Sequence, residues 1–282
     1  MYDVIIIGKG PAGISTALYT VRGNLSTLII GKNDSVLKKA EKIENYYGFA
    51  NPVSGEFLLR EGEKQILRLG VEIVEDEVIA IEQGENFKVM TADETYIAKA
   101  ILLATGQPLK KVKIENLKDF EGKGVSYCTT CDGFFYRNLK VGVLGYKDYA
   151  IHEAMELKAF TQDITIFTNG KELELTDKFR DDAKNFKLNN KVIARVDGGE
   201  FIEKVCFEDG TEEKVDGMFI AYESASSTDF ARKMGIIIED NAIVVDNFQQ
   251  TNIEGVFAAG DCTGGFKQIS TAVGQGAMAG KK

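Results

Sequence analysis

The first hundred residues alternate short apolar runs with longer amphipathic stretches. Residues 2–7 form a nearly continuous apolar run of strand length, and a helical pattern follows it through Arg22. Further strands are predicted at residues 26–30, 72–75, 78–82, 87–91 and 98–104, and a helix at residues 55–69. Strands that alternate with helices in this way are typical of an α/β protein with a parallel sheet.

A second succession of the same kind begins after residue 139. An apolar strand at residues 140–144 precedes a helical pattern through Phe160, and another strand follows at residues 164–167. The stretch from Lys191 to Val215 reads as strand, turn and strand, with a hairpin turn at residues 208–211. Later strands are predicted at residues 218–222, 242–245 and 255–259, and a small-residue helix at residues 270–279. The pattern therefore predicts an α/β fold with two Rossmann-like domains.

A glycine motif stands where the first strand meets the first helix. Residues 8–13 read G-x-G-x-x-G in the required context, after a strand and at the start of a helix. The first glycine allows a tight turn, the second lets backbone approach a pyrophosphate, and the third lets the helix pack on the strand. We therefore expect a dinucleotide here. The next strand ends in Gly31 and Lys32 rather than in the acid that usually holds the ribose hydroxyls.

Size and composition indicate a globular protein with two domains. The chain has 282 residues, of which 44% are hydrophobic, with 29 glycines and three prolines, which is enough for a large core and two domains. It shows no charged start followed by an apolar run and a cleavage site, and no apolar stretch of membrane-spanning length. We expect a cytoplasmic protein that does not act at a membrane.

The charge of the chain and its distribution indicate which kinds of partner it can bind. The formal net charge of −9 disfavours nucleic acid as the main partner. If residues 114–240 are taken as a central segment, it holds 17 Lys and Arg against 25 Asp and Glu, which leaves 17 against 18 elsewhere. The acidity therefore belongs to the middle of the chain.

Two cysteines carry the most specific chemistry. Cys128 and Cys131 are separated by two threonines and followed by Asp132. Such a pair can close a small disulfide ring or chelate a metal. A role as small apolar residues explains neither the threonines nor the acid. Exchange needs an attacking thiolate and a proton source for the leaving sulfur, so we interpret the pair as a redox dithiol served by Asp132.

A zinc site is the alternative use of the cysteine pair. The remaining ligands would have to come from three residues that are scattered singly along the chain, namely Cys206, Cys262 and His152. Structural zinc sites usually bring their ligands in closely spaced pairs. We therefore expect no metal site, and we interpret Cys262 as a structural residue because no other cysteine is near it in sequence.

Two later segments suit a flat ligand that carries hydroxyl groups. Ala104, Thr105 and Gly106 follow a buried strand, where glycine permits close passage of such a ligand. Gly260 and Asp261 follow the strand at residues 255–259, and an aspartate there can bind a polyol hydroxyl. The N-terminus of the helix that follows can stabilise negative charge on a reduced ring.

The second Rossmann-like turn lacks its binding chemistry. Its glycine at the middle position is replaced by Lys147, whose side chain would occupy the space where backbone meets pyrophosphate. The next strand ends in Thr168 and Asn169, without an arginine cluster for a ribose 2′-phosphate, and the buried strand after the hairpin leads to Glu223 and Ser224. The architecture of a nicotinamide domain is thus predicted without its contacts.

Together these motifs resemble those of the low-molecular-weight thioredoxin reductases over nearly the whole chain. The resemblance implies a redox-active Cys128/Cys131 disulfide that FAD reduces, with Asp132 as the acid-base residue. It also implies a set of FAD-binding residues: Gly8, Gly10, Pro11, Ala12, Gly13, Gly31, Lys32, Asn45, Val78, Ala104, Thr105, Gly106, Gly260, Asp261, Lys267, Gln268 and Ile269.

The resemblance also implies a domain plan. An FAD-binding domain would comprise residues 1–113 and 241–282, and residues 114–240 would form an inserted, smaller redox domain with the CxxC and a degenerate nucleotide site. Since the dithiol cannot face the flavin and a protein substrate at once, we expect the inserted domain to reorient on linkers near 110–117 and 239–248. Family membership further implies a homodimer that reduces thioredoxin.

The electron donor is where the chain departs from the family pattern. Members that use NADPH carry two glycine motifs and a His-Arg-Arg type cluster at positions where this chain has Lys147, Thr168 and Glu223. Because all three are altered, the chain looks like the branch in which ferredoxin replaces NADPH. Ferredoxins are usually acidic, so docking is expected on the near-neutral flavin domain, at a set of lysines comprising Lys38, Lys39, Lys42, Lys110 and Lys111.

Three alternatives remain open at this stage. An atypical enzyme could still use NADPH through an altered turn. A two-flavin disulfide reductase would place a second flavin where nicotinamide normally lies. A non-enzymatic flavin-binding redox sensor would turn over no disulfide protein.

Overall fold

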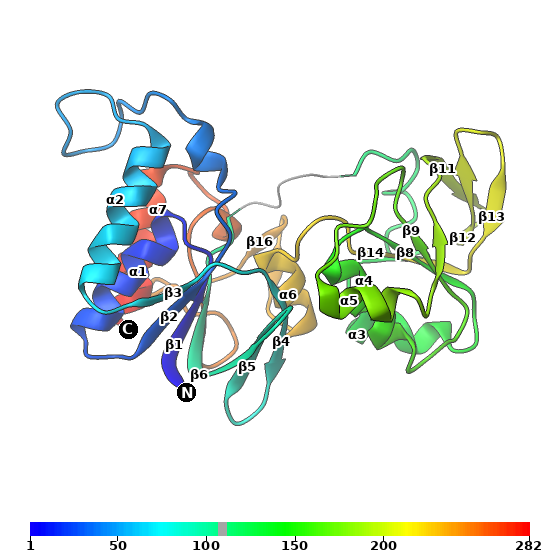
Figure 1. Cartoon of the computed structure of the whole chain (residues 1–282), viewed down its shortest axis with the longest axis horizontal. Coiled ribbons are helices and arrows are strands. Elements are labelled where there is room, and N and C mark those ends of the chain that lie inside the picture. The colour runs from blue at the N-terminus through cyan, green and yellow to red at the C-terminus, as the bar shows by residue number, and fades with distance from the viewer. Residues whose placement is uncertain (107–111) are drawn as a thin grey trace. The chain divides into compact units, whose positions relative to one another are not determined.

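The computed structural model describes residues 1–106 and 112–282, and the chain divides into two compact units (Figure 1). The first unit combines Met1–Leu109 with Ser226–Lys282, and the second is Lys110–Ala225. The first unit is therefore built from two separate stretches of chain.

The first unit is organised on a seven-stranded sheet whose main path is β3-β2-β1-β6-β5-β4. Strands β1, β2, β3 and β17 run parallel with their neighbours, whereas β5 pairs antiparallel with β4 and β6. Strand β6 is long enough to pair with β5 near its start and with β17 near its end. The strands are β1 (Tyr2–Ile7), β2 (Thr27–Ile30), β3 (Glu72–Val74), β4 (Val78–Gln83), β5 (Phe87–Thr91), β6 (Thr95–Leu103) and β17 (Val256–Ala258).

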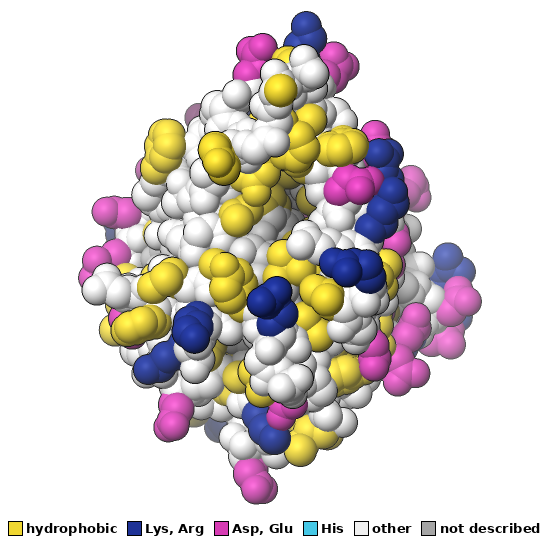
Figure 2. Space-filling model, turned by 90° about the vertical axis from the view of Figure 1, so that its left-hand side faces the viewer, with side chains coloured by type: hydrophobic (Ala, Val, Ile, Leu, Met, Phe, Trp, Pro, Cys, Tyr) yellow, Lys and Arg dark blue, Asp and Glu magenta, His cyan; other side chains and the backbone are white. Residues whose placement is uncertain are grey.

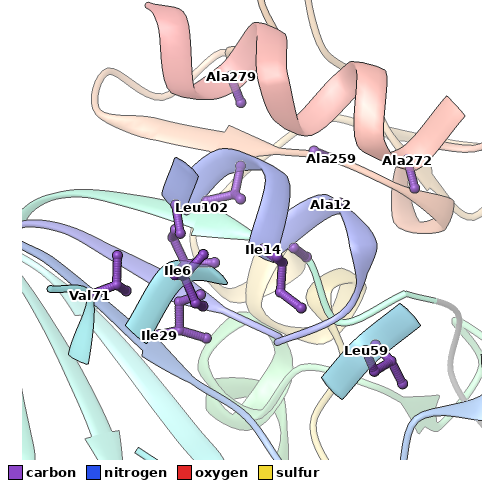
Figure 3. Packing of buried hydrophobic residues seen from close by; sticks show 13 residues of the cluster. Ile6, Ala12, Ile14, Ile29, Leu59, Val71, Leu102, Ala259, Ala272 and Ala279 are labelled. Carbon is purple, nitrogen blue, oxygen red and sulfur yellow. The ribbon is translucent and has the colours of Figure 1, made fainter. Parts of the chain in front are cut away.

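Helices α1 (Pro11–Arg22) and α7 (Ile269–Lys281) pack closely in this unit, as Figure 1 and Figure 3 show. A Cβ on Gly276 of α7 would lie 2.2 Å from the carbonyl oxygen of Ala12, so only glycine allows this approach. The hydroxyl of Ser15 donates to the carbonyl of Val273 at 2.7 Å, and that of Thr16 to the carbonyl of Gly276 at 2.9 Å. Small residues therefore join the two helices, and the core beneath them includes Ile6, Ile29 and Leu102.

The other elements of this unit are short apart from α2. They are η1 (Val36–Lys39), α2 (Gly55–Arg68), α6 (Ser227–Lys233), β15 (Ile238–Glu239), β16 (Ala242–Ile243) and the 3-10 helix η3 (Asp261–Thr263). Ser54 begins α2 by accepting a hydrogen bond from the backbone of Phe57. Strands β15 and β16 pair as a small antiparallel ribbon.

The second unit has a five-stranded parallel sheet in the order β10-β9-β8-β14-β7 and a three-stranded antiparallel sheet in the order β11-β12-β13. Its strands are β7 (Val125–Ser126), β8 (Val141–Leu144), β9 (Ile164–Phe167), β10 (Lys187–Asn189), β11 (Ile193–Gly198), β12 (Ile202–Phe207), β13 (Glu212–Lys214) and β14 (Gly217–Ile220). Its helices are α3 (Thr129–Asp132), η2 (Gly133–Tyr136), α4 (Asp148–Leu157) and α5 (Asp177–Ala183).

The predicted α/β fold with two Rossmann-like domains is confirmed. Several details differ. Helix α4 ends at Leu157 rather than Phe160, because the amide of Phe160 turns back to the carbonyl of Leu157. The short helices α5 and α6 were not expected from the pattern, and a hairpin between β11 and β12 adds a third strand to the predicted pair.

The second boundary between the units lies earlier than the predicted residue 240/241. Residues 226–240 belong with the first unit, and α6 is tied to the end of β6. The hydroxyls of Ser227 and Thr105 lie 2.8 Å apart, and the amide of Ser227 donates to the Thr105 hydroxyl at 2.8 Å. The chain therefore crosses near Ala225, and the expected linker at 239–248 lies inside the first unit. The other expected linker was placed at 110–117, and its residues 110 and 111 lie outside the described residues.

Within the described parts of the chain, no helix combines the length and the apolar character needed to cross a lipid bilayer.

Candidate functional site

The two central cysteines form a disulfide bond. Cys128 is the residue before α3, and its sulfur accepts a hydrogen bond from the amide of Cys131 at 3.1 Å. Cys128 is 4% exposed, whereas Cys131 lies at the surface. Of the two cysteines, Cys131 is therefore the more accessible to a reaction partner.

Asp132 is held beside the disulfide by Ser126. The Ser126 hydroxyl accepts from the amide of Cys128 at 3.1 Å and donates to the Asp132 carboxylate at 2.6 Å. Burial, followed by the charge of Asp132, raises the pKa of Tyr136. The structure thus brings together all three predicted catalytic residues and adds Ser126, which no motif in the sequence marks.

The glycine turn of the first unit is shaped for a closely approaching ligand. A Cβ on Gly8 would lie 2.3 Å from the carbonyl oxygen of Ala104, and one on Gly13 would lie 2.0 Å from that of Gly8. A Cβ on Gly10 would meet nothing within 4 Å, so this side of the turn is open. Pro11 opens α1, where its missing amide costs no hydrogen bond. This is the cradle that a pyrophosphate requires.

Two lysines lie near the glycine turn, Lys9 within it and Lys32 after the end of β2. Gly31 lies against the glycine turn, since its Cβ would be 2.9 Å from the Lys9 amide. Lys9 is buried, and its ammonium group contacts Asn33 and the carboxylate of Glu63 at 3.2 Å. Lys32 pairs with Glu77, the residue before Val78. The contact between Lys32 and Glu77 brings the segment after β2 next to the segment that leads to Val78. A lysine inside a glycine motif was the available signal for Lys9.

The remaining predicted cofactor residues come from segments far apart in sequence. Thr105 and its neighbours Ala104 and Gly106 follow β6, beside Ser227. Gly260 has a φ of +84°, and its Cβ would lie 3.1 Å from that of Ala12, so the segment with Asp261 passes the start of α1. The Asn45 side chain donates to Gln268 at 2.9 Å, next to Lys267 and Ile269 at the start of α7.

These residues fit a dinucleotide such as FAD. The cradle at Gly8 and Gly13, the close pass of Gly260 and the bond from Asn45 to Gln268 gather the predicted segments around the N-termini of α1 and α7. Neither helix has a side-chain cap at its first amides. Both ends can therefore face negative charge.

The corresponding turn in the second unit is filled by the protein itself. Lys147 bonds to the Glu223 carboxylate at 2.8 Å and lies 3.9 Å from that of Glu174. Residues 147 and 174 form a β-bridge, and the amide of Glu174 donates to the carbonyl of Tyr146 at 2.9 Å. Asp148, in the first turn of α4, accepts from the amide of Thr176 at 2.9 Å. Carboxylates and backbone therefore stand where a pyrophosphate would need to bind.

Neighbouring side chains strengthen this arrangement. Burial, followed by a hydrogen bond to Glu223, raises the pKa of Tyr146. Tyr146 and Tyr222 pack edge to face with ring centres 5.3 Å apart. At the end of β9, the Asn169 side chain accepts from the amide of Ile193 at 2.7 Å, so it serves the fold.

The other two cysteines are buried. Cys262 is 1% exposed and contacts the carbonyl oxygens of Leu103 and Ala259 at 3.4 Å and 3.3 Å. Burial raises the pKa of its thiol to about 12. Cys206 lies on β12 and is also buried. Neither thiol is placed for exchange with a partner.

A family model described as pyridine nucleotide-disulphide oxidoreductase matches residues 2–276. Among curated proteins, the chain is similar to the thioredoxin reductase of Listeria innocua, with 36% identity over an alignment of 297 positions that covers all of this chain and 92% of the relative. It is also similar to the thioredoxin reductase of Bacillus subtilis, with 33% identity over 99% of this chain and 92% of the relative.

Two solved structures are informative neighbours. The atypical thioredoxin reductase TRi from Desulfovibrio vulgaris Hildenborough shares 41% identity at a TM-score of 0.94, over 99% of this chain and 96% of that one. A ferredoxin-flavin thioredoxin reductase from Clostridium acetobutylicum shares 32% identity at a TM-score of 0.71, over 99% of this chain and 95% of that one.

Proposed function

Because the chain belongs to the low-molecular-weight thioredoxin reductases within the pyridine nucleotide-disulphide oxidoreductases, we propose that it passes electrons from reduced ferredoxin through FAD and the Cys128/Cys131 disulfide to thioredoxin. By its family, the chain is a flavoprotein disulfide reductase of the thioredoxin reductase type. To this we add ferredoxin as its electron donor, thioredoxin as its protein substrate and a homodimer as its assembly.

The dithiol and its neighbours supply the exchange chemistry. FAD held by the glycine turn at Gly8 and Gly13 would supply the two electrons that open the Cys128–Cys131 bond. One thiolate of the reduced pair attacks the disulfide of thioredoxin and forms a mixed disulfide, and the other displaces it, which closes the bond again and releases reduced thioredoxin. Asp132, held by Ser126 beside Cys128, gives a proton to the leaving sulfur or takes one from the attacking thiol.

The observation that carries the donor assignment is the filled turn of the second unit. NADPH brings a pyrophosphate and a 2′-phosphate, which need backbone amides and bidentate donors. Here the ammonium group of Lys147 bonds to Glu223, and Asp148 occupies the first turn of α4. Adding phosphates beside these carboxylates would place like charges together at a helix N-terminus. The same obstacle disfavours a second flavin at this turn.

The first unit offers a surface that suits an acidic protein. Lys38 and Lys39 on η1 and the nearby Lys42 are exposed. The segment after them carries Tyr47, which is 98% exposed, and Phe49. Figure 2 shows a face of the first unit on which hydrophobic side chains gather, with lysine and arginine side chains beside them. The other two lysines of the predicted set, Lys110 and Lys111, lie outside the described residues.

Rapid anaerobic mixing tests the donor. We expect reduced ferredoxin to bleach the bound flavin at a rate that supports turnover with thioredoxin, and NADPH to do so far more slowly, because its phosphates meet the carboxylates of the filled turn. Dithionite-reduced enzyme, assayed with oxidised thioredoxin alone, serves as the donor-independent control. If NADPH reduces the flavin fast enough for turnover and ferredoxin does not, the donor assignment fails, whereas the disulfide chemistry is judged by the control.

A further inference from the structure

Two glutamate side chains meet a single hydroxyl next to the disulfide. Thr129 follows Cys128 in the chain and is 1% exposed. Its Oγ1 lies 2.7 Å from Glu153 Oε2 and 2.5 Å from Glu156 Oε2. Both glutamates are on α4, and Glu153 is 2% exposed. The mechanism described above makes no use of these two acids.

The two contacts of the Thr129 hydroxyl with Glu153 and Glu156 require one proton more than the hydroxyl supplies. Both separations are those of O–H···O hydrogen bonds, so each needs a proton between its oxygens. A threonine hydroxyl provides one, and an ionised carboxylate provides none. The second proton must therefore sit on a carboxyl group.

We propose that Glu153 and Glu156 share one proton through the Thr129 hydroxyl, and that this proton sets the reduction potential of the Cys128–Cys131 disulfide. Reduction adds two electrons and one proton to the disulfide and leaves one thiol and one thiolate. The thiolate adds a negative charge one residue from Thr129, in surroundings where Cys128 is nearly buried and water screens weakly. A pair that keeps its proton opposes that charge less than a doubly ionised pair does.

Other charged and titratable groups form the background of this pair. On α4 itself, His152 Nδ1 lies 3.5 Å from Glu153 Oε1. On and just after α5, which packs against α4, Asp177 pairs with Arg180 and Asp181 pairs with Lys184. On the elements around the disulfide lie Asp132 and Tyr136. The variants below leave all of these groups unchanged, so a difference between variants reports on the pair.

The experiment equilibrates the FAD-loaded full chain with dithiothreitol and its disulfide from about pH 6 to about pH 9, and counts free thiols after an acid quench. The variants are Glu156→Gln, Thr129→Ser and Thr129→Val, with Glu172→Gln, an exposed acid of the second unit, as control. This readout concerns the disulfide alone, so it is separate from the identity of the electron donor or of the protein substrate.

In Glu156→Gln, a neutral amide replaces the protonated carboxyl. Its equilibrium constant near neutral pH should therefore match that of the wild type within about twofold. As the pH rises and the pair loses its proton, the wild-type disulfide should become at least about tenfold harder to reduce than the variant's, which is about 30 mV for two electrons. Thr129→Ser and Glu172→Gln should show the same pH dependence of the equilibrium constant as the wild type. Thr129→Val should shift the pH above which the disulfide becomes harder to reduce.

Infrared absorption gives a direct second readout. A carboxylic C=O band should be present near neutral pH in the wild type and absent in Glu156→Gln. The proposal is overturned if the wild type lacks this band and the variant differs more than about tenfold near neutral pH, because both acids are then ionised. It is also overturned if the two proteins coincide at every pH, or if Glu172→Gln shifts the equilibrium as much as Glu156→Gln does.

Discussion

Single residues decide how the disulfide reacts, beginning with the two sulfurs. Replacing either Cys128 or Cys131 by serine should reduce thioredoxin turnover to background, because exchange needs both sulfurs, while FAD stays bound in the first unit. Absorbance of the flavin and thioredoxin-coupled turnover measure the two effects. Cys206→Ala is the matched control, since this buried cysteine lies in the same unit. Full activity in either serine variant would show that the disulfide is not the relay.

Asp132→Asn should slow turnover by about 10² to 10⁴-fold without loss of FAD, because the amide cannot exchange a proton with a sulfur. Steady-state rates with thioredoxin and the flavin absorbance test this. Ser126→Ala should have a smaller effect of the same sign, since it removes only the hydroxyl that holds Asp132. An Asp132→Asn enzyme with wild-type rates would remove the acid-base role.

Cys262 should resist alkylation when the protein is folded. Burial raises the pKa of its thiol to about 12, so the thiolate is scarce near pH 8, and its sulfur lies among backbone carbonyls. After reduction, iodoacetamide labelling and mass spectrometry should find Cys131 modified first and Cys262 unmodified. Because an unfolded thiol ionises at lower pH than the folded one, this residue makes the protein less stable as the pH rises from about 9 toward 12. Rapid labelling of Cys262 in the native protein would contradict the burial described here.

At the level of helices and strands, the contact of α1 with α7 leaves no room for a side chain at Gly276. Gly276→Ala should lower the free energy of unfolding by roughly 1–3 kcal/mol, because its Cβ would press on the Ala12 carbonyl. Gly274→Ala, on the same helix with open space at its Cβ, should raise it by up to about 1 kcal/mol. Denaturant unfolding of both variants is the measurement. Equal effects in the two would mean that the helices are not in close contact.

The sequence pattern predicted most strands within a residue or two, because buried strands such as β1, β8 and β9 are apolar runs with polar ends. It missed α5 and α6, which have only seven residues each and therefore no sustained period. It also missed the strands β7, β10 and β15, which have only two or three residues each. The strand that ends in Ile220 and the helix that begins at Ser227 are close in sequence, so no compositional change marked the boundary between them.

The candidate site was predictable where its residues are neighbours in sequence, as at Cys128, Cys131 and Asp132. Contacts across long separations left no local signal. No periodicity shows that Glu153 reaches Thr129, or that residues 174–176 lie across the turn after β8. The assignment of individual FAD contacts remains a prediction, because it derives from a resemblance of motifs.

For the molecule as a whole, the electron donor should dock through the first unit. Charge reversal at Lys38 and Lys39 should lower the second-order rate of flavin reduction by ferredoxin, and the wild-type rate should fall as salt rises. Stopped-flow mixing at several ionic strengths measures both. Lys171→Glu, at an exposed lysine of the second unit, is the control. A rate that ignores salt and charge reversal would place the docking surface elsewhere.

The split construction of the first unit has a consequence for biosynthesis. A ribosome releases the second unit as one continuous stretch, so that unit can fold while translation continues. The seven-stranded sheet is completed later, because β17 pairs with β6 only after more than 150 further residues have been made. Incorporation of flavin should therefore follow synthesis of α7, and nascent chains stalled before β17 should contain a protease-resistant second unit without cofactor.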